Sequence, residues 1–121
     1  MIDKADSMLQ EFKKIKSKID LQNSKNLMIL IDRAREKAKA AAKLIREDFG
    51  ASRVILYGSL ATGHFVEGSD IDVLVEGFNG SFWDMYVQVE EIAAPIPISV
   101  ICKEDALESL IKEASERGVE I

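Results

Sequence analysis

The chain has 121 residues, of which 47% are hydrophobic and 31% are charged, and it carries a net charge of −5. This composition is ordinary for one globular domain, and no apolar stretch approaches the ~20 residues that a membrane-spanning helix needs. The single cysteine, Cys102, and the single histidine exclude an internal disulfide and a zinc cluster, and they favour a reducing cytoplasm.

The charge is distributed unevenly along the chain. Residues 1–49 hold 12 basic and 8 acidic side chains, a balance of +4, whereas residues 50–121 hold 4 and 13, a balance of −9. A long nucleic acid is an improbable ligand for so acidic a C-terminal half, because phosphate contacts need cations.

The first 49 residues predict two amphipathic helices. Residues 2–19 place apolar side chains three and four positions apart, the stretch Asp20 to Ser24 looks like a break, and a second helix then runs to about Asp48 before Gly50. The two helices could form a hairpin packed on the domain, or they could pair between subunits. We therefore expect residues 1–49 to be a helical extension of a core formed by residues 50–121.

The remaining residues alternate between strand and helix signals. Ser81 and Asp84 suggest an N-terminal cap for a helix, and Pro97 indicates that its strand either lies at an edge of the sheet or begins there. The fold class is thus α+β, a small mixed sheet with helices mainly on one face. The expected elements are strand 53–57, a short helix from Ser59, a loop 63–69, strand 70–76, helix 82–93, a strand ending near Cys102, and helix 104–117.

A chemical motif lies between the first two strands. Gly58 and Ser59 form a small turn after the first strand, and after ten intervening residues Asp70 and Asp72 stand at the start of the second. Side chains two apart on a strand share one face, so the carboxylates point to one place and suit a divalent cation. A glycine turn before a helix can hold phosphate, although Ser59 could be only a helix cap.

These residues resemble the signature of the nucleotidyltransferase superfamily related to DNA polymerase beta, and in particular its minimal nucleotidyltransferases. The resemblance covers about residues 50–117 and implies Mg²⁺, or Mn²⁺, held by Asp70 and Asp72 as catalytic and metal-binding residues. It further implies a nucleoside triphosphate, ATP in the first place, bound with the help of Gly58, Ser59 and Ser69. The activity it implies is transfer of a nucleoside monophosphate to a hydroxyl acceptor.

The chain departs from the family pattern in two respects. Leu60 and Thr62 stand where small family members often carry arginine, and the more serious departure is on the later strand. The family has a third carboxylate on the later strand, where this chain has Ser99 between Ile98 and Val100. This departure leaves a second interpretation open, a non-catalytic nucleotide-binding or protein-interaction module. Among small family members the partner is often a helical protein of HEPN type in a toxin–antitoxin pair, and the N-terminal helices of this chain offer a surface for such a partner or for a homodimer.

Overall fold

The computed structural model describes residues 4–121, and the side chains of residues 7–121. The expected helix start at Ile2 therefore lies outside the described residues. In chain order the helices are α1 (Lys4–Phe49), α2 (Ser59–Thr62), α3 (Phe82–Ala93) and α4 (Glu108–Arg117), with a 3₁₀ turn at Lys103–Asp105. The strands are β1 (Arg53–Tyr57), β2 (Ile71–Glu76), β3 (Ile98–Cys102) and β4 (Val119–Glu120).

The four strands form one mixed sheet in the order β3-β2-β1-β4. β1 pairs antiparallel with both β2 and β4, whereas β2 and β3 are parallel because α3 connects them as a crossover. Pro97 comes just before β3, which is an edge strand as expected. The predicted α+β class with a small mixed sheet is confirmed.

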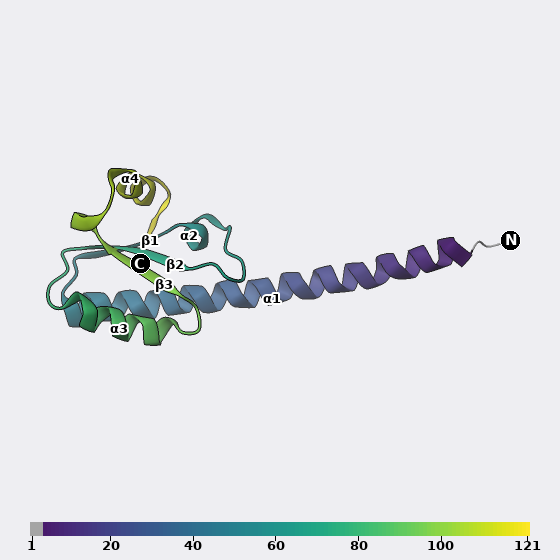
Figure 1. Ribbon diagram of the computed structural model, residues 1–121, viewed down its shortest axis with the longest axis horizontal. Coiled ribbons are helices and arrows are strands. Elements are labelled where there is room, and N and C mark those ends of the chain that lie inside the picture. Colours follow the sequence, from purple (N-terminus) through teal and green to yellow (C-terminus); the bar gives the residue numbers. More distant parts are fainter. Residues whose placement is uncertain (1–3) are drawn as a thin grey trace.

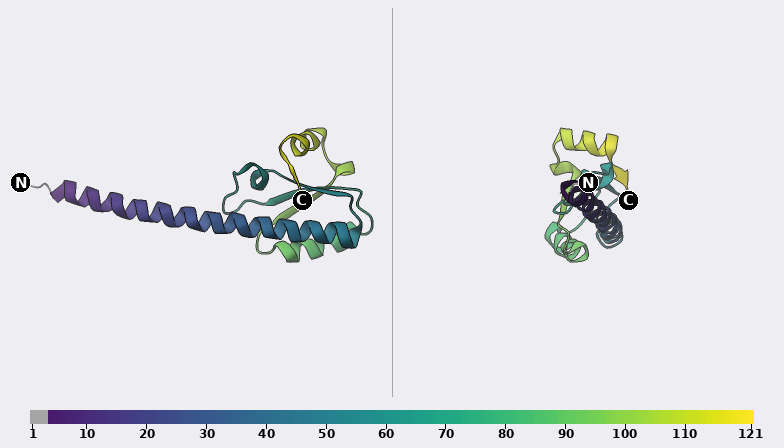
Figure 2. Two further views of the ribbon diagram at one scale, coloured as in Figure 1. Left: turned by 180° about the vertical axis from the view of Figure 1, so that it is seen from behind. Right: turned by 90° about the vertical axis from the view of Figure 1, so that its right-hand side faces the viewer.

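Helices cover both faces of this sheet unequally. α1 and α3 lie side by side against one face, and the shorter α4 lies across the other (Figure 2). The larger core joins Val54, Leu56, Val73 and Val75 of the sheet to the buried alanines of α1. A smaller cluster joins Ile55, Tyr57 and Leu74 to Ala114 of α4, so the side chains of β1 and β2 alternate between the two cores.

The predicted helical hairpin is wrong. Residues 4–49 form one continuous helix, which packs on the sheet through its C-terminal part and runs out from the domain through its N-terminal part (Figure 1). Asp20 and Ser24 do not break it, and the Ser24 hydroxyl donates to the Asp20 carbonyl within the continuous helix. The predicted stop is correct, since α1 ends at Phe49 and Gly50 has φ +69°. Although α1 is long, no helix among the described residues is apolar enough over its length to cross a membrane.

Two smaller differences concern the C-terminal end. The helix expected from residue 104 begins at Glu108, because residues 103–105 form the 3₁₀ turn instead. β4 was not expected, and its two residues are too few to give an alternating pattern. α3 begins as predicted, with the Ser81 hydroxyl accepting a hydrogen bond from the Asp84 N–H at 3.3 Å.

Candidate active site

Three side chains form one row across the sheet on the face that α4 covers. Asp72 of β2 is paired with Tyr57 of β1 on one side and with Ser99 of β3 on the other. Neighbouring strands are roughly 4.8 Å apart, so Ser99 stands directly beside Asp72. The sequence analysis assigned Ser99 to a later strand, and the β2–β3 register places that residue next to Asp72.

Gly58 brings the turn after β1 into contact with Asp72. A Cβ added at Gly58 would lie 2.5 Å from Oδ2 of Asp72, which is closer than real Cβ contacts come. The residue has φ +75° and ψ −153°, a backbone conformation open essentially to glycine alone. Gly58 is therefore required for the close approach of the turn to the carboxylate.

Asp72 lies in an environment that disfavours its charge. The pKa of its carboxyl is raised, first by burial, then by the negative charge of Asp70, and third by that of Glu113 on α4. Asp70 was expected to be the first residue of the strand, but β2 begins at Ile71, so Asp70 lies in the exposed loop before it, where its charge still acts on Asp72. Glu113 was missed, because its nearness depends on how α4 docks on the sheet.

Tyr57 is the other group that sequence reasoning missed. Burial, followed by the charges of Asp72 and Glu113, raises the pKa of its hydroxyl to about 12. The phenol is therefore a neutral donor at any physiological pH, next to a site rich in negative charge. Its place beside Asp72 follows from the β1–β2 register, which no local motif reveals.

The two predicted serine contacts have different surroundings. Gly58 is the N-cap of α2 and Ser59 is its first residue, so the interpretation of Ser59 as a mere cap is wrong. The Ser69 hydroxyl accepts a hydrogen bond from the Val66 N–H at 3.1 Å and closes the turn before β2. It also borders a groove of about 460 Å³ with Leu30, Phe65 and Ile96.

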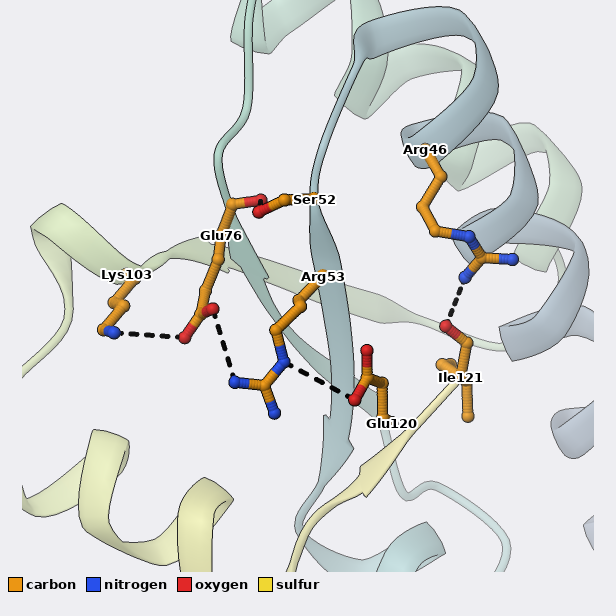
Figure 3. Close-up of polar contacts among 7 residues, drawn as sticks. All are labelled: Arg46, Ser52, Arg53, Glu76, Lys103, Glu120 and Ile121. Carbon is orange, nitrogen blue, oxygen red and sulfur yellow. Dashed lines mark hydrogen bonds and ion pairs between the residues drawn. The ribbon is translucent and has the colours of Figure 1, made fainter.

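Glu76, at the far end of β2, belongs to a separate ion-pair network (Figure 3). Its carboxylate lies 3.2 Å from Nζ of Lys103 and 3.5 Å from the Arg53 guanidinium, which also pairs with Glu120. Because Glu76 already forms ion pairs with the Arg53 and Lys103 side chains at the far end of β2, it does not serve as a third metal-binding carboxylate beside Asp70 and Asp72.

The donor set fits one divalent cation. Asp70 and Asp72 supply hard carboxylate oxygens, and burial followed by the charge of Asp70 raises the pKa of Asp72, so a cation held there would relieve an unfavourable negative charge. Among residues 7–121 no third acidic, histidine or cysteine side chain completes a metal-binding group. Because position 99 is a serine, the site has two carboxylates and no third among the described residues.

The four-stranded mixed sheet with its helices matches the nucleotidyltransferase fold. A family model described as nucleotidyltransferase domain matches residues 38–121, and the chain belongs to that family. The predicted resemblance to the polymerase beta-like superfamily is thereby confirmed. No curated protein matches the chain in sequence.

Solved structures share the fold at low sequence identity. A protein described as a minimal nucleotidyltransferase is 21% identical with a TM-score of 0.62, covering 75% of this chain and 95% of that one. A toxin–antitoxin complex with AMP-PNP is 19% identical with a TM-score of 0.58, covering 69% and 70%. A tri-AMPylated HEPN toxin from Shewanella oneidensis in complex with an MNT antitoxin is 16% identical, with a TM-score of 0.53 and coverage of 72% and 70%.

Proposed function

We propose that the protein is a Mg²⁺-dependent nucleotidyltransferase that transfers a nucleoside monophosphate, AMP in the first place, from the triphosphate to a hydroxyl group. The observation that carries this proposal is the close approach of Gly58 to Asp72, which sets a glycine turn against a carboxylate in the row that Tyr57 and Ser99 complete. A structural domain would gain nothing from a half-buried carboxylate whose neighbours are also acidic.

Each residue of the site has a distinct role in this proposal. Gly58 and Ser59 hold the outer phosphates beside the acids, and Asp70 and Asp72 hold the cation. When bound, Mg²⁺ would neutralise charge on the triphosphate and help to orient the α-phosphate. The acceptor hydroxyl gives up its proton to solvent as its oxygen forms the new bond to the α-phosphorus, the bond from that phosphorus to the bridging β-phosphate oxygen breaks, and pyrophosphate leaves. Tyr57, protonated throughout, can donate to an oxygen of the substrate.

The acceptor that we favour is a hydroxyl on a partner protein of HEPN type. Two structural similarities support this acceptor. This chain shares its fold with a chain of a complex in which the HEPN toxin is AMPylated, and with a chain of a toxin–antitoxin complex that contains AMP-PNP. A protein acceptor also agrees with the net charge of −9 in residues 50–121, which disfavours a long nucleic acid.

The alternative is a module that binds the nucleotide without transferring it. Ser99 favours this alternative, because the residue beside Asp72 is a neutral hydroxyl where the resemblance implies a carboxylate. A serine hydroxyl is a weak metal ligand and no general base near neutral pH.

One experiment separates the two functions. The full chain is incubated with α-labelled ATP, Mg²⁺ and a HEPN-type protein as acceptor, and both pyrophosphate release and label on protein are measured. Nucleotidyl transfer predicts both signals, and the module predicts nucleotide binding with neither. Asp72→Asn should abolish the signals, whereas the same change at the exposed Asp48, far from the site on α1, should preserve them.

A further inference from the structure

The outer part of α1 carries apolar side chains that nothing in the domain covers. Residues 7–26 are exposed throughout, and the helix leaves the domain along this stretch (Figure 1). Phe12 is 65% exposed and Ile15 is 57% exposed, with Met8 and Ile19 similarly open. Four large apolar side chains exposed together on one helix mark a site of interaction with another molecule.

These residues follow the spacing of a coiled coil. From Met8 the steps to Phe12, Ile15 and Ile19 are four, three and four residues, and the same alternation continues through Gln22, Asn26 and Ile29. This is the heptad pattern in which positions a and d form a seam between two helices. We infer that the seam (Met8, Phe12, Ile15, Ile19, Gln22, Asn26 and Ile29) pairs with the same seam of a second copy of this chain in a parallel coiled coil.

Where α1 begins to contact the domain, near residues 29–31, the seam faces away from the domain. Ile29 is 51% exposed, whereas Ile31 packs against the larger core, and two residues correspond to about 160° around a helix. The next positions of the heptad, Arg33, Glu36 and Ala40, are all exposed. A second helix can therefore lie along the seam without meeting the domain.

Polar residues within the seam select the parallel direction. In a parallel pair in register, Gln22 meets Gln22 and Asn26 meets Asn26 of the second copy, so amides face amides. An antiparallel pair centred between Ile15 and Ile19 would instead set Gln22 against Phe12 and Asn26 against Met8. A polar residue at an a position is known to specify register in this way.

The charges beside the seam agree with the same direction. Position g holds Glu11 and position e of the next heptad holds Lys16, which face each other across a parallel pair. The antiparallel arrangement would bring Lys16 close to Lys16 and Lys18 close to Lys18 of the second copy. Charge complementarity thus identifies the partner as another copy of this chain, with both domains at the same end of the pair.

The test compares two equally exposed positions by sedimentation of the full chain. Ile19, 53% exposed, lies on the seam, and Leu21, 59% exposed, lies off it. We expect the wild type and Leu21→Asp to sediment as dimers and Ile19→Asp as a monomer. Neither side chain contacts the domain, so the thermal unfolding of the domain serves as a check that both variants fold. A monomeric wild type, or dimers that Ile19→Asp leaves intact, would overturn the inference.

A crosslink tests the direction. Mild oxidation of Gln22→Cys should give a disulfide-linked dimer, because parallel chains in register bring the two thiols together. The antiparallel register would separate them by ten residues, about 15 Å along the axis. Cys102 is buried, so the oxidised wild type is the control and should remain unlinked. Absence of the linked dimer would refute the parallel arrangement. This inference concerns assembly alone and stands or falls independently of nucleotidyl transfer.

Discussion

The two ends of α1 are one helix with two different surfaces. Near its C-terminal end, Ala34, Ala38, Ala41 and Ile45 are fully or almost fully buried against the sheet and α3. Towards its N-terminal end, larger side chains such as Phe12 are open to solvent. Small residues lie where a sheet approaches closely, and large ones lie where the domain supplies no cover. The helix thus serves the domain at one end and a separate contact at the other.

This comparison explains why the sequence indicates two helices. The apolar pattern changes its side of the helix between Ile19 and Leu27, and a change of phase in a periodic pattern resembles a break in the chain. The polar stretch at the change, Asp20 to Ser24, strengthens that impression. The helix continues because its hydrogen bonds are local, whereas the phase depends on what each face contacts.

The largest expected effect is on the stability of the domain. Ala41→Asp would bury an unpaired carboxylate at a position with no exposed surface, and it should lower the free energy of unfolding by at least about 3 kcal/mol. The same aspartate at Leu21 should change it by less than about 0.5 kcal/mol. Urea denaturation of both variants measures the difference, and similar losses would show that the outer helix also belongs to the folded domain.

The second prediction concerns the metal-binding carboxylate. Asp72→Asn should weaken Mg²⁺-dependent ATP binding at least about hundredfold, or ~2.7 kcal/mol, because it removes the charge that holds the cation. Asp48→Asn should bind like the wild type. Calorimetric titration measures both affinities, and an unchanged affinity for Asp72→Asn would refute the metal assignment.

The third prediction tests the contact at Gly58. Gly58→Ala should cost about 1–3 kcal/mol of stability and also weaken nucleotide binding, because the methyl group would collide with Asp72 in a strained backbone. Gly63→Ala is the matched control, since Gly63 also has positive φ, +83°, but meets nothing within 4 Å. Thermal unfolding and ATP titration of the two variants should differ. Equal effects would mean that the approach to Asp72 is unimportant.

The fourth prediction concerns the missing carboxylate. Ser99→Asp should raise the rate of transfer at least about tenfold, a barrier change of ~1.4 kcal/mol, by adding an acid beside Asp72. Ser99→Asn, similar in size but neutral, should not. Initial rates of pyrophosphate release are compared for the wild type and the two variants. If Ser99→Asp leaves a fast wild-type rate unchanged, some other group completes the site.

The smallest expected effect is on how the stability of the metal-free protein depends on pH. The pKa of Asp72 is raised in the folded protein, so its contribution to stability is fully present below the ordinary aspartate pKa of about 3.9 and is lost as pH rises through the folded value. Asp72→Asn should therefore be the more stable protein at pH 7, with the advantage shrinking at lower pH. Chemical denaturation in EDTA at several pH values tests this, and an advantage that grows on acidification would contradict it.

Most elements of the domain were predictable because their signals are local. Residues 53–57 contain a short continuous apolar run, the helix at 82–93 is preceded by the cap at Ser81, and Gly50 and Pro97 mark boundaries. β4 and the late start of α4 were not predictable, because they depend on packing against β1 and the rest of the sheet.

The same distinction applies to the candidate site. Local sequence is enough to recognise the spacing from Gly58 to Asp72 and to assign Ser99 to a later strand. Tyr57 and Glu113 become neighbours of Asp72 only through strand register and the docking of α4. Long-range contacts of that kind leave no periodic signal.

Paramagnetic broadening by Mn²⁺ tests the central claim most directly. Amide spectra of the full chain are compared with Mg²⁺-ATP and with trace Mn²⁺ replacing Mg²⁺. We predict that broadening centres on Gly58, Asp70, Asp72 and Ser99 and spares the outer helix at residues 7–26. Broadening centred on the Glu76 ion-pair network or on α1, or none at all, would contradict a metal–nucleotide site at the start of β2.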